Sequence, residues 1–199
     1  MKNIKSLTRR SIKGLLLILI SSLFLVWSCQ NDADQDPAPS MIQDMQKADD
    51  LTANVKSLKA AKNFVAPMEG AQEVPPADTK ARGNAIFHLR DDGLHYRIIV
   101  ANLENLSMAH IHLAPAGSNG GVVVWLHPSG PPPQLIPGRT SGILATGIIT
   151  EANLVGSLAE GTLEDLLEHM RMGNAYVNVH TTQYPGGEIR GQIKPAGPK

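Results

Sequence analysis

Three histidines occupy positions from which they could share one metal ion. His110 and His112 are separated by one residue, so in an extended strand both imidazoles project from the same face. His180 ends a second alternating segment, 176–180, and lies on its polar face. Three neutral imidazoles that leave a fourth position open form an exchangeable or catalytic-type site for zinc or copper. The spacing therefore predicts a copper or zinc site at His110, His112 and His180. The alternative is that these histidines hold loops by hydrogen bonds, without a metal.

Polar residues that could support the three histidines follow from the same alternation. Asn178 shares the polar face with His180, and in segment 186–193 the isoleucines point to the core while Glu188 and Arg190 point away from it. If the two segments are neighbouring strands, Glu188 or Arg190 lies close to His180. Asn178 and Glu188 are then candidates for hydrogen bonding a ring nitrogen, the kind of contact that orients a metal ligand.

Other kinds of chemistry find little support in the sequence. It contains no Gly-x-Ser-x-Gly elbow, phosphate loop or dinucleotide fingerprint. No nucleophile and base stand in a recognisable arrangement, so no catalytic residue is predicted. Basic patches with interleaved aromatic residues are missing as well, which argues against a nucleic-acid partner.

The first 28 residues have the layout of a secretory signal peptide. Basic residues without any acid precede the apolar stretch 14–28, which is shorter than the roughly 20 residues of a spanning helix. Residues 26–28 followed by Cys29 resemble the recognition motif of the lipoprotein signal peptidase. Cys29 is the single cysteine of the chain, so it cannot form an internal disulfide, and lipidation accounts for it. We expect cleavage before Cys29 and a lipid on it; the alternative is a free or intermolecularly paired thiol beside an uncleaved anchor.

Segment 29–62 is predicted to be an acidic linker between the lipidated cysteine and a folded domain. Residues 30–40 are acidic and contain proline, so they bury too little surface to order themselves. Segment 41–62 carries an approximate helical stripe, for which a short amphipathic helix and disorder are both open. The expected location is the cell envelope, lipid-anchored at the outer membrane on its periplasmic or surface face. The expected partners are that membrane and an unidentified protein or envelope component.

Residues 63–195 have the texture of one β-rich domain, followed by a tail at 196–199. Short runs of alternating hydrophobicity are bounded by Gly, Pro and Asn, and a single helical stripe interrupts them between Thr162 and Gly173. The predicted fold is all-β, an antiparallel Greek-key-like β-sandwich with one short helix, preceded by the signal peptide and flexible tether. The expected strands are 63–68, 83–90, 94–102, 108–113, 121–127, 143–150, 175–181 and 188–194. The Pro-rich segment 128–141 is expected to be a long loop.

Three motifs, in order along residues 64–193, make the chain resemble the CHRD family, the domain named for chordin. They are Gly70 to Pro76 (GAQEVPP), Ala109 to His112 (AHIH), and Tyr176 to Thr181 (YVNVHT) followed by PGGEIRG at 185–191. The resemblance implies an extracellular or envelope β-sandwich, with protein binding inferred from the animal proteins that contain it, and it does not imply an enzyme.

The His-x-His pair also resembles part of the copper site of Cu/Zn superoxide dismutase, but the remaining ligands of that enzyme have no match here. Two functions are therefore open from the sequence: a tethered, non-enzymatic binding or structural module, and a three-histidine copper or zinc domain that could be redox active.

Overall fold

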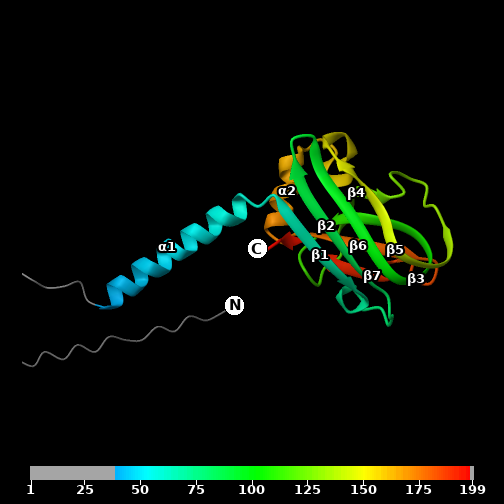
Figure 1. Ribbon diagram of the computed structural model, residues 1–199, viewed down its shortest axis with the longest axis horizontal. Coiled ribbons are helices and arrows are strands. Elements are labelled where there is room, and N and C mark those ends of the chain that lie inside the picture. The colour runs from blue at the N-terminus through cyan, green and yellow to red at the C-terminus, as the bar shows by residue number, and fades with distance from the viewer. Residues whose placement is uncertain (1–38, 198–199) are drawn as a thin grey trace, which may run out of the picture. The chain divides into compact units, whose positions relative to one another are not determined.

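The computed structural model describes residues 39–197. The predicted signal peptide and Cys29 lie outside these residues. The fold-class prediction is confirmed: the domain is built mainly from antiparallel strands, which wrap around a common interior (Figure 1). The main elements are α1 (Pro39–Lys59), β1 (Asn63–Glu69), β2 (Arg82–Arg90), β3 (Gly93–Leu113), β4 (Gly121–His127), β5 (Ile136–Ile149), α2 (Leu163–Arg171), β6 (Ala175–Thr181), β7 (Ile189–Gln192) and β8 (Lys194–Pro195), with short 3₁₀ helices at Gly70–Gln72, Glu151–Asn153 and Gly156–Leu158.

Helix α1 occupies the segment for which helix and disorder were both open. Met45, Leu51 and Val55 of this helix are exposed. Within the part of the chain that the structure describes, no helix is long and apolar enough to cross a membrane. The linker helix therefore buries little of its apolar stripe.

The strands form a closed sheet. Hydrogen bonding runs in the order β2-β1-β7-β6-β3, and β3 pairs back to β2, so the sheet has a continuous interior. β4 and β5 pair with β3 outside this ring, and β8 pairs with β1. The predicted hairpin is present, because Arg90 pairs with Gly93 across Asp91 and Asp92. β3 is therefore the strand around which the domain is organised.

Two details of the predicted strands were wrong. Segments 94–102 and 108–113 belong to one strand, β3, which passes through Asn102 and Asn105 with φ of 60° and 52°. These residues coincide with register shifts against β5. Asparagine tolerates this left-handed conformation, so β3 bends there without ending. The Pro-rich loop is also shorter than expected, because β5 begins at Ile136 and pairs with Leu106 of β3.

The hydrophobic core lies inside the ring of strands. Alternation predicts the inner face of β3 correctly at Leu94, Ile98 and Val100, which are almost completely buried, while Tyr96 is half-buried and donates to the Leu126 carbonyl at 2.9 Å. The whole core cluster and its partly buried neighbours lie between residues 61 and 193, within the compact unit Gln43–Lys199. The core is therefore formed within that unit.

Helix α2 confirms the predicted capping. Thr162 and Asp165 form a reciprocal capping box, in which the Thr162 side chain accepts from the Asp165 amide and the Asp165 carboxylate accepts from the Thr162 amide. Leu166, Leu167 and Met170 are buried in the core. The helix thus covers one end of the strands, as Figure 1 shows.

Candidate metal centre

The structure brings the three predicted histidines together. β3 and β6 are antiparallel neighbours, with Met108 opposite His180 and His110 opposite Asn178. One nitrogen from each of His110, His112 and His180 lies within 4.8 Å of the other two. Nδ1 of His110 is 3.2 Å from Nε2 of His180. Ile111 points the other way and is completely buried in the core, as the alternation requires.

Backbone carbonyls orient two of the rings. Nδ1 of His112 donates to the Gly120 carbonyl at 3.0 Å, and Nδ1 of His180 donates to the Pro185 carbonyl at 2.9 Å. A carbonyl can only accept, so the proton of each neutral ring is on Nδ1 and the lone pair is on Nε2; that of His180 faces Nδ1 of His110. Nε2 of His110 and of His112 are buried without a hydrogen-bond partner among the described residues. The cluster therefore has lone pairs available at its centre.

Burial keeps the three rings neutral. His110, His112 and His180 are 3%, 8% and 6% exposed. Desolvation, reinforced by the neighbouring imidazoles, lowers the pKa of His110 from its ordinary 6.5 to about 3. Desolvation lowers the pKa of His180 to about 4 despite the Pro185 carbonyl, and it lowers that of His112. Neutral imidazole is the form that binds metals, so the cluster is ready to do so at neutral pH.

We expect the metal-free protein to lose stability as the pH falls from 6.5 toward 4. Unfolded histidine takes up a proton below about 6.5, whereas His110 and His180 stay neutral in the fold until about 3 and 4, so acid favours the unfolded chain. Glu73 acts in the opposite direction, because its raised pKa of about 7 reduces stability as the pH rises from 4.5. Because two histidines oppose one glutamate, the net effect of acid is a loss of stability. Urea midpoints at pH 5, 6 and 7 with a chelator would measure how stability changes with pH. The double variant His110→Ala/His180→Ala should show a smaller change. A parental protein equally stable at pH 5 and 7 would contradict the expectation.

A stack of three side chains supports His112 from outside. The Tyr176 ring lies parallel to His112, with centroids 4.9 Å apart and planes 9° apart. The Arg190 guanidinium lies over the Tyr176 ring, 3.4 Å from its centroid, in a cation–π contact. The Tyr176 hydroxyl accepts from the Gly120 amide at 3.2 Å, and Gly120 in turn holds His112. Tyr176 therefore fixes His112 both directly and through Gly120.

The polar residues expected beside the histidines form other contacts. Asn178 donates to both carboxylate oxygens of Glu73 at 2.7 and 2.9 Å. Glu188 accepts from the hydroxyls of Thr79 and Thr181 at 2.6 and 2.7 Å. Among the described contacts, neither Asn178 nor Glu188 bonds an imidazole. Through these bonds they hold Glu73 and Thr79, which follow β1, against β6.

Arg190 was expected to point away from the core, and it does so into a second buried layer. It is 1% exposed, and its guanidinium donates to Asn119 at 3.2 Å and to the Pro115 carbonyl at 3.3 Å.

Glu73 is the residue that sequence reasoning missed. It is 5% exposed, and desolvation raises its pKa to about 7 against the opposing charge of Arg190. Its place in the GAQEVPP motif, as the single acid of that segment, was the available signal.

Substituting Gly120 tests how tightly this region is packed. A Cβ at Gly120 would lie 1.8 Å from the Leu113 carbonyl oxygen, so Gly120→Ala requires a backbone shift, and we expect a loss of about 1–3 kcal/mol of stability. Gly121→Ala is the matched control, because a Cβ there meets nothing within 4 Å. Chemical denaturation of both variants would measure the difference. Equal stability of the two would show that the segment adjusts without cost.

Comparison with known proteins identifies relatives of the same domain. The family model for the CHRD domain matches residues 64–193. Chordin from Xenopus laevis is 33% identical over 137 residues, which covers 64% of this chain and 12% of the relative. Chordin from Danio rerio is 34% identical over 138 residues, which again covers 64% of this chain and 12% of the relative. No solved structure matches. The matched region contains all three histidines.

Proposed function

The chain belongs to the CHRD domain family, and from that premise we propose that its domain binds one copper or zinc ion through His110, His112 and His180. The observation that carries the proposal is the convergence of three buried neutral imidazoles, with nitrogens within 4.8 Å of one another. Backbone carbonyls hold the Nδ1 protons of His112 and His180, which leaves Nε2 of both rings unprotonated. Imidazole is a ligand that both zinc and copper accept readily.

The arrangement supports a metal better than it supports a purely structural histidine cluster. Buried polar nitrogens in a folded protein normally find a hydrogen-bond partner, yet two ring nitrogens of the cluster have none in the described region. A metal ion would satisfy Nε2 of His112 directly. With no carboxylate among the three ligands, the ion keeps its positive charge and a coordination position for a further ligand.

Metal content of the protein as purified tests the proposal. Tag-free protein prepared without chelator should contain close to one copper or zinc per chain by mass spectrometry, and the variant His110→Ala/His180→Ala should contain none. His169→Ala, a histidine on α2 outside the cluster, is the matched control and should load normally. A metal-free parent that also fails to take up added copper or zinc would refute the metal site.

We further propose that the chain is a lipoprotein held at the cell envelope by Cys29, with the outer membrane as its site. The support is the sequence itself: a basic, then apolar leader ends at the single cysteine, and an acidic linker follows. Cys29→Ala should abolish incorporation of labelled fatty acid. Fatty-acid labelling that is equal in the variant and the parent would refute lipidation at this residue.

A binding or structural role without catalysis is the second candidate, and one surface favours it. The segment between β4 and β5 is rich in proline and ends at Leu135, an apolar side chain that is 53% exposed. An unidentified envelope protein is the partner that such a surface would bind. This role predicts that cells with a folded His110→Ala/His180→Ala variant behave like cells with the parent protein. The metal role predicts that they behave like cells that lack the protein.

A further inference from the structure

A cationic pocket lies on the outer face of the sheet, on the opposite side of β3 from the core. The pocket encloses about 570 Å³ between the outward side chains of β2, β3 and β5. Its polar lining includes Arg90 and His88 from β2, and Arg97 and His95 from β3. Its lining residues include no acid, and the nearest carboxylate, that of Asp92, is paired with His95 at its edge. Its charge is therefore complementary to an anion.

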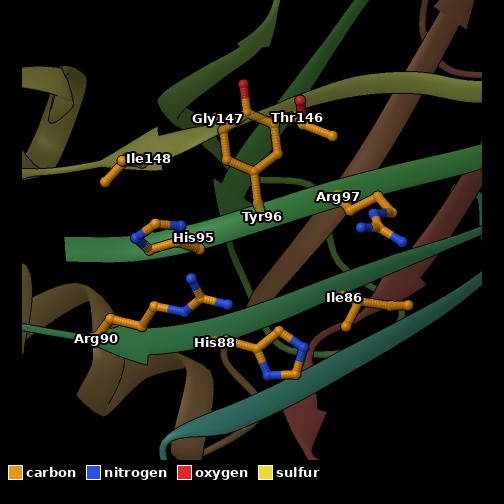
Figure 2. A pocket seen from close by; sticks show the side chains of 9 residues that line it. All are labelled: Ile86, His88, Arg90, His95, Tyr96, Arg97, Thr146, Gly147 and Ile148. Carbon is orange, nitrogen blue, oxygen red and sulfur yellow. The ribbon is translucent and has the colours of Figure 1, made fainter. Parts of the chain in front are cut away.

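The two arginines are available for a ligand. Neither guanidinium has an ion-pair or hydrogen-bond partner among residues 39–197, in contrast to Arg82, Arg139 and Arg171, each of which pairs with a glutamate. In Figure 2 the Arg90 guanidinium lies between His95 and His88, and Arg97 extends from β3 toward β2. Guanidinium groups bind phosphate through paired hydrogen bonds. Arg97 is opposite Ile86, four residues along β2 from Arg90, so the two arginines flank the pair His88 and His95 and a phosphate would lie between them.

The two histidines are held in place by their neighbours. His88 and His95 are directly opposite each other in the β2–β3 register. Nδ1 of His88 is 2.7 Å from Oδ1 of Asn63, and Nε2 of His95 is 2.6 Å from Oδ1 of Asp92. Each ring keeps its second nitrogen free. The floor between the two arginines is thus polar and ordered.

Apolar side chains continue the same face beyond the pocket. Ile148 lines it and is 44% exposed, and Ile143, further along β5, is 63% exposed. Ile143 is opposite Ile99 of β3, which is 37% exposed and points outward as well. A face that combines unpaired arginines with protruding aliphatic side chains matches the interface of an anionic bilayer, where headgroup phosphates lie above acyl chains.

We propose that this pocket binds the phosphate of an anionic phospholipid headgroup, with Arg90 and Arg97 as its ligands and Ile143 and Ile148 in contact with the bilayer. The linker joins the domain at Asn63, whose side chain contacts His88 at the rim, so a lipid attached at Cys29 would tether the pocket to a membrane. The inference rests on that proposed anchor and involves no metal.

Vesicle binding by the full chain with Cys29→Ala, which cannot carry the proposed lipid, tests the inference without the anchor. We expect binding to phosphatidylcholine vesicles that contain phosphatidylglycerol and not to phosphatidylcholine alone. Arg90→Gln/Arg97→Gln should weaken binding about 10- to 30-fold. Arg82→Gln/Arg139→Gln is the matched control, because it removes the same charge elsewhere on the domain, and it should change binding less than twofold. Ile143→Ser should weaken vesicle binding without affecting binding of free glycerol phosphate.

Three results would overturn the proposal. Equal losses in the two double variants would mean attraction by overall charge alone. Binding of free glycerol phosphate without a preference for phosphatidylglycerol vesicles would identify a soluble phosphate compound as the ligand. Failure to bind either probe would leave the pocket without this role. Lipidation of Cys29 is measured separately, so failure of the pocket and failure of the anchor are distinguishable.

Discussion

Removing any one ligand of the histidine cluster is expected to weaken binding of copper or zinc by more than about 100-fold, because loss of an outer-shell partner alone already costs about 10- to 100-fold. The reason is that His110, His112 and His180 are the full set of converging nitrogens in the described cluster, and two imidazoles cannot replace the third. Titration calorimetry on metal-free His110→Ala, His112→Ala and His180→Ala would measure the three losses against the parent.

Two controls separate ligand loss from unfolding. His169→Ala removes a half-buried histidine of α2 and should bind metal like the parent. The melting temperature of each metal-free variant reports whether it still folds, and His110→Gln provides a variant that keeps a polar side chain of similar size. A folded single variant with unchanged affinity would place the metal elsewhere or exclude that residue as a ligand.

Replacing Arg190 by methionine is expected to cost about 3–5 kcal/mol of stability, a melting temperature lower by roughly 6–20 °C. The guanidinium is almost completely buried, stacks on Tyr176, and donates to Asn119 and Pro115. Its loss removes both hydrogen bonds and the stack on Tyr176, and it leaves a void where the buried guanidinium was. It also removes the positive charge that lowers the pKa of Glu73, so that pKa should rise above about 7.

Thermal and urea unfolding would measure the stability change, and NMR titration would follow the carboxyl of Glu73. Arg190→Lys keeps the charge but loses the planar group that stacks on Tyr176, so an intermediate loss is expected. Arg82→Met is the control, because Arg82 is exposed and its pairing with Glu69 contributes at most about 1 kcal/mol. Similar stability of Arg190→Met and Arg82→Met would show that the buried stack does not stabilise the fold.

The features that sequence predicts well are those with a local physical cause. Alternation along a strand has a period of two, so it assigns Ile111 to the core and His110 with His112 to the opposite face, as the structure shows. The capping box of α2 spans Thr162 to Asp165 and needs no knowledge of the remaining fold. The resemblance to the CHRD family is likewise carried by short motifs, and the family model covers the same residues.

The features that sequence does not predict depend on segments far apart in the chain. Glu73 bonds Asn178 across 105 residues, and no pattern near either residue indicates that pairing. Alternation separates Arg190 from the core face of β7, but it cannot show that loops cover the other face and bury the guanidinium as well. The closure of the sheet depends on β3 pairing with both β2 and β6, which a list of expected strands leaves open.

The position of the histidines within the sheet also affects how fast a metal ion would exchange. The stretch of β3 that holds His110 and His112 is hydrogen-bonded to β4 on one side and to β6 on the other, and β6 is itself bonded to β7. His110 and His112 therefore do not lie on a strand edge that could fray, whereas His180 lies one residue past the last β6–β7 pair and is held by the Pro185 carbonyl. An ion would have to enter and leave past the covering loops that contain Gly120 and Pro185, whose carbonyls hold the rings. The centre should then be kinetically inert, with exchange half-times governed by loop opening rather than by affinity, so a brief exposure to chelator would leave even a moderately bound ion in place.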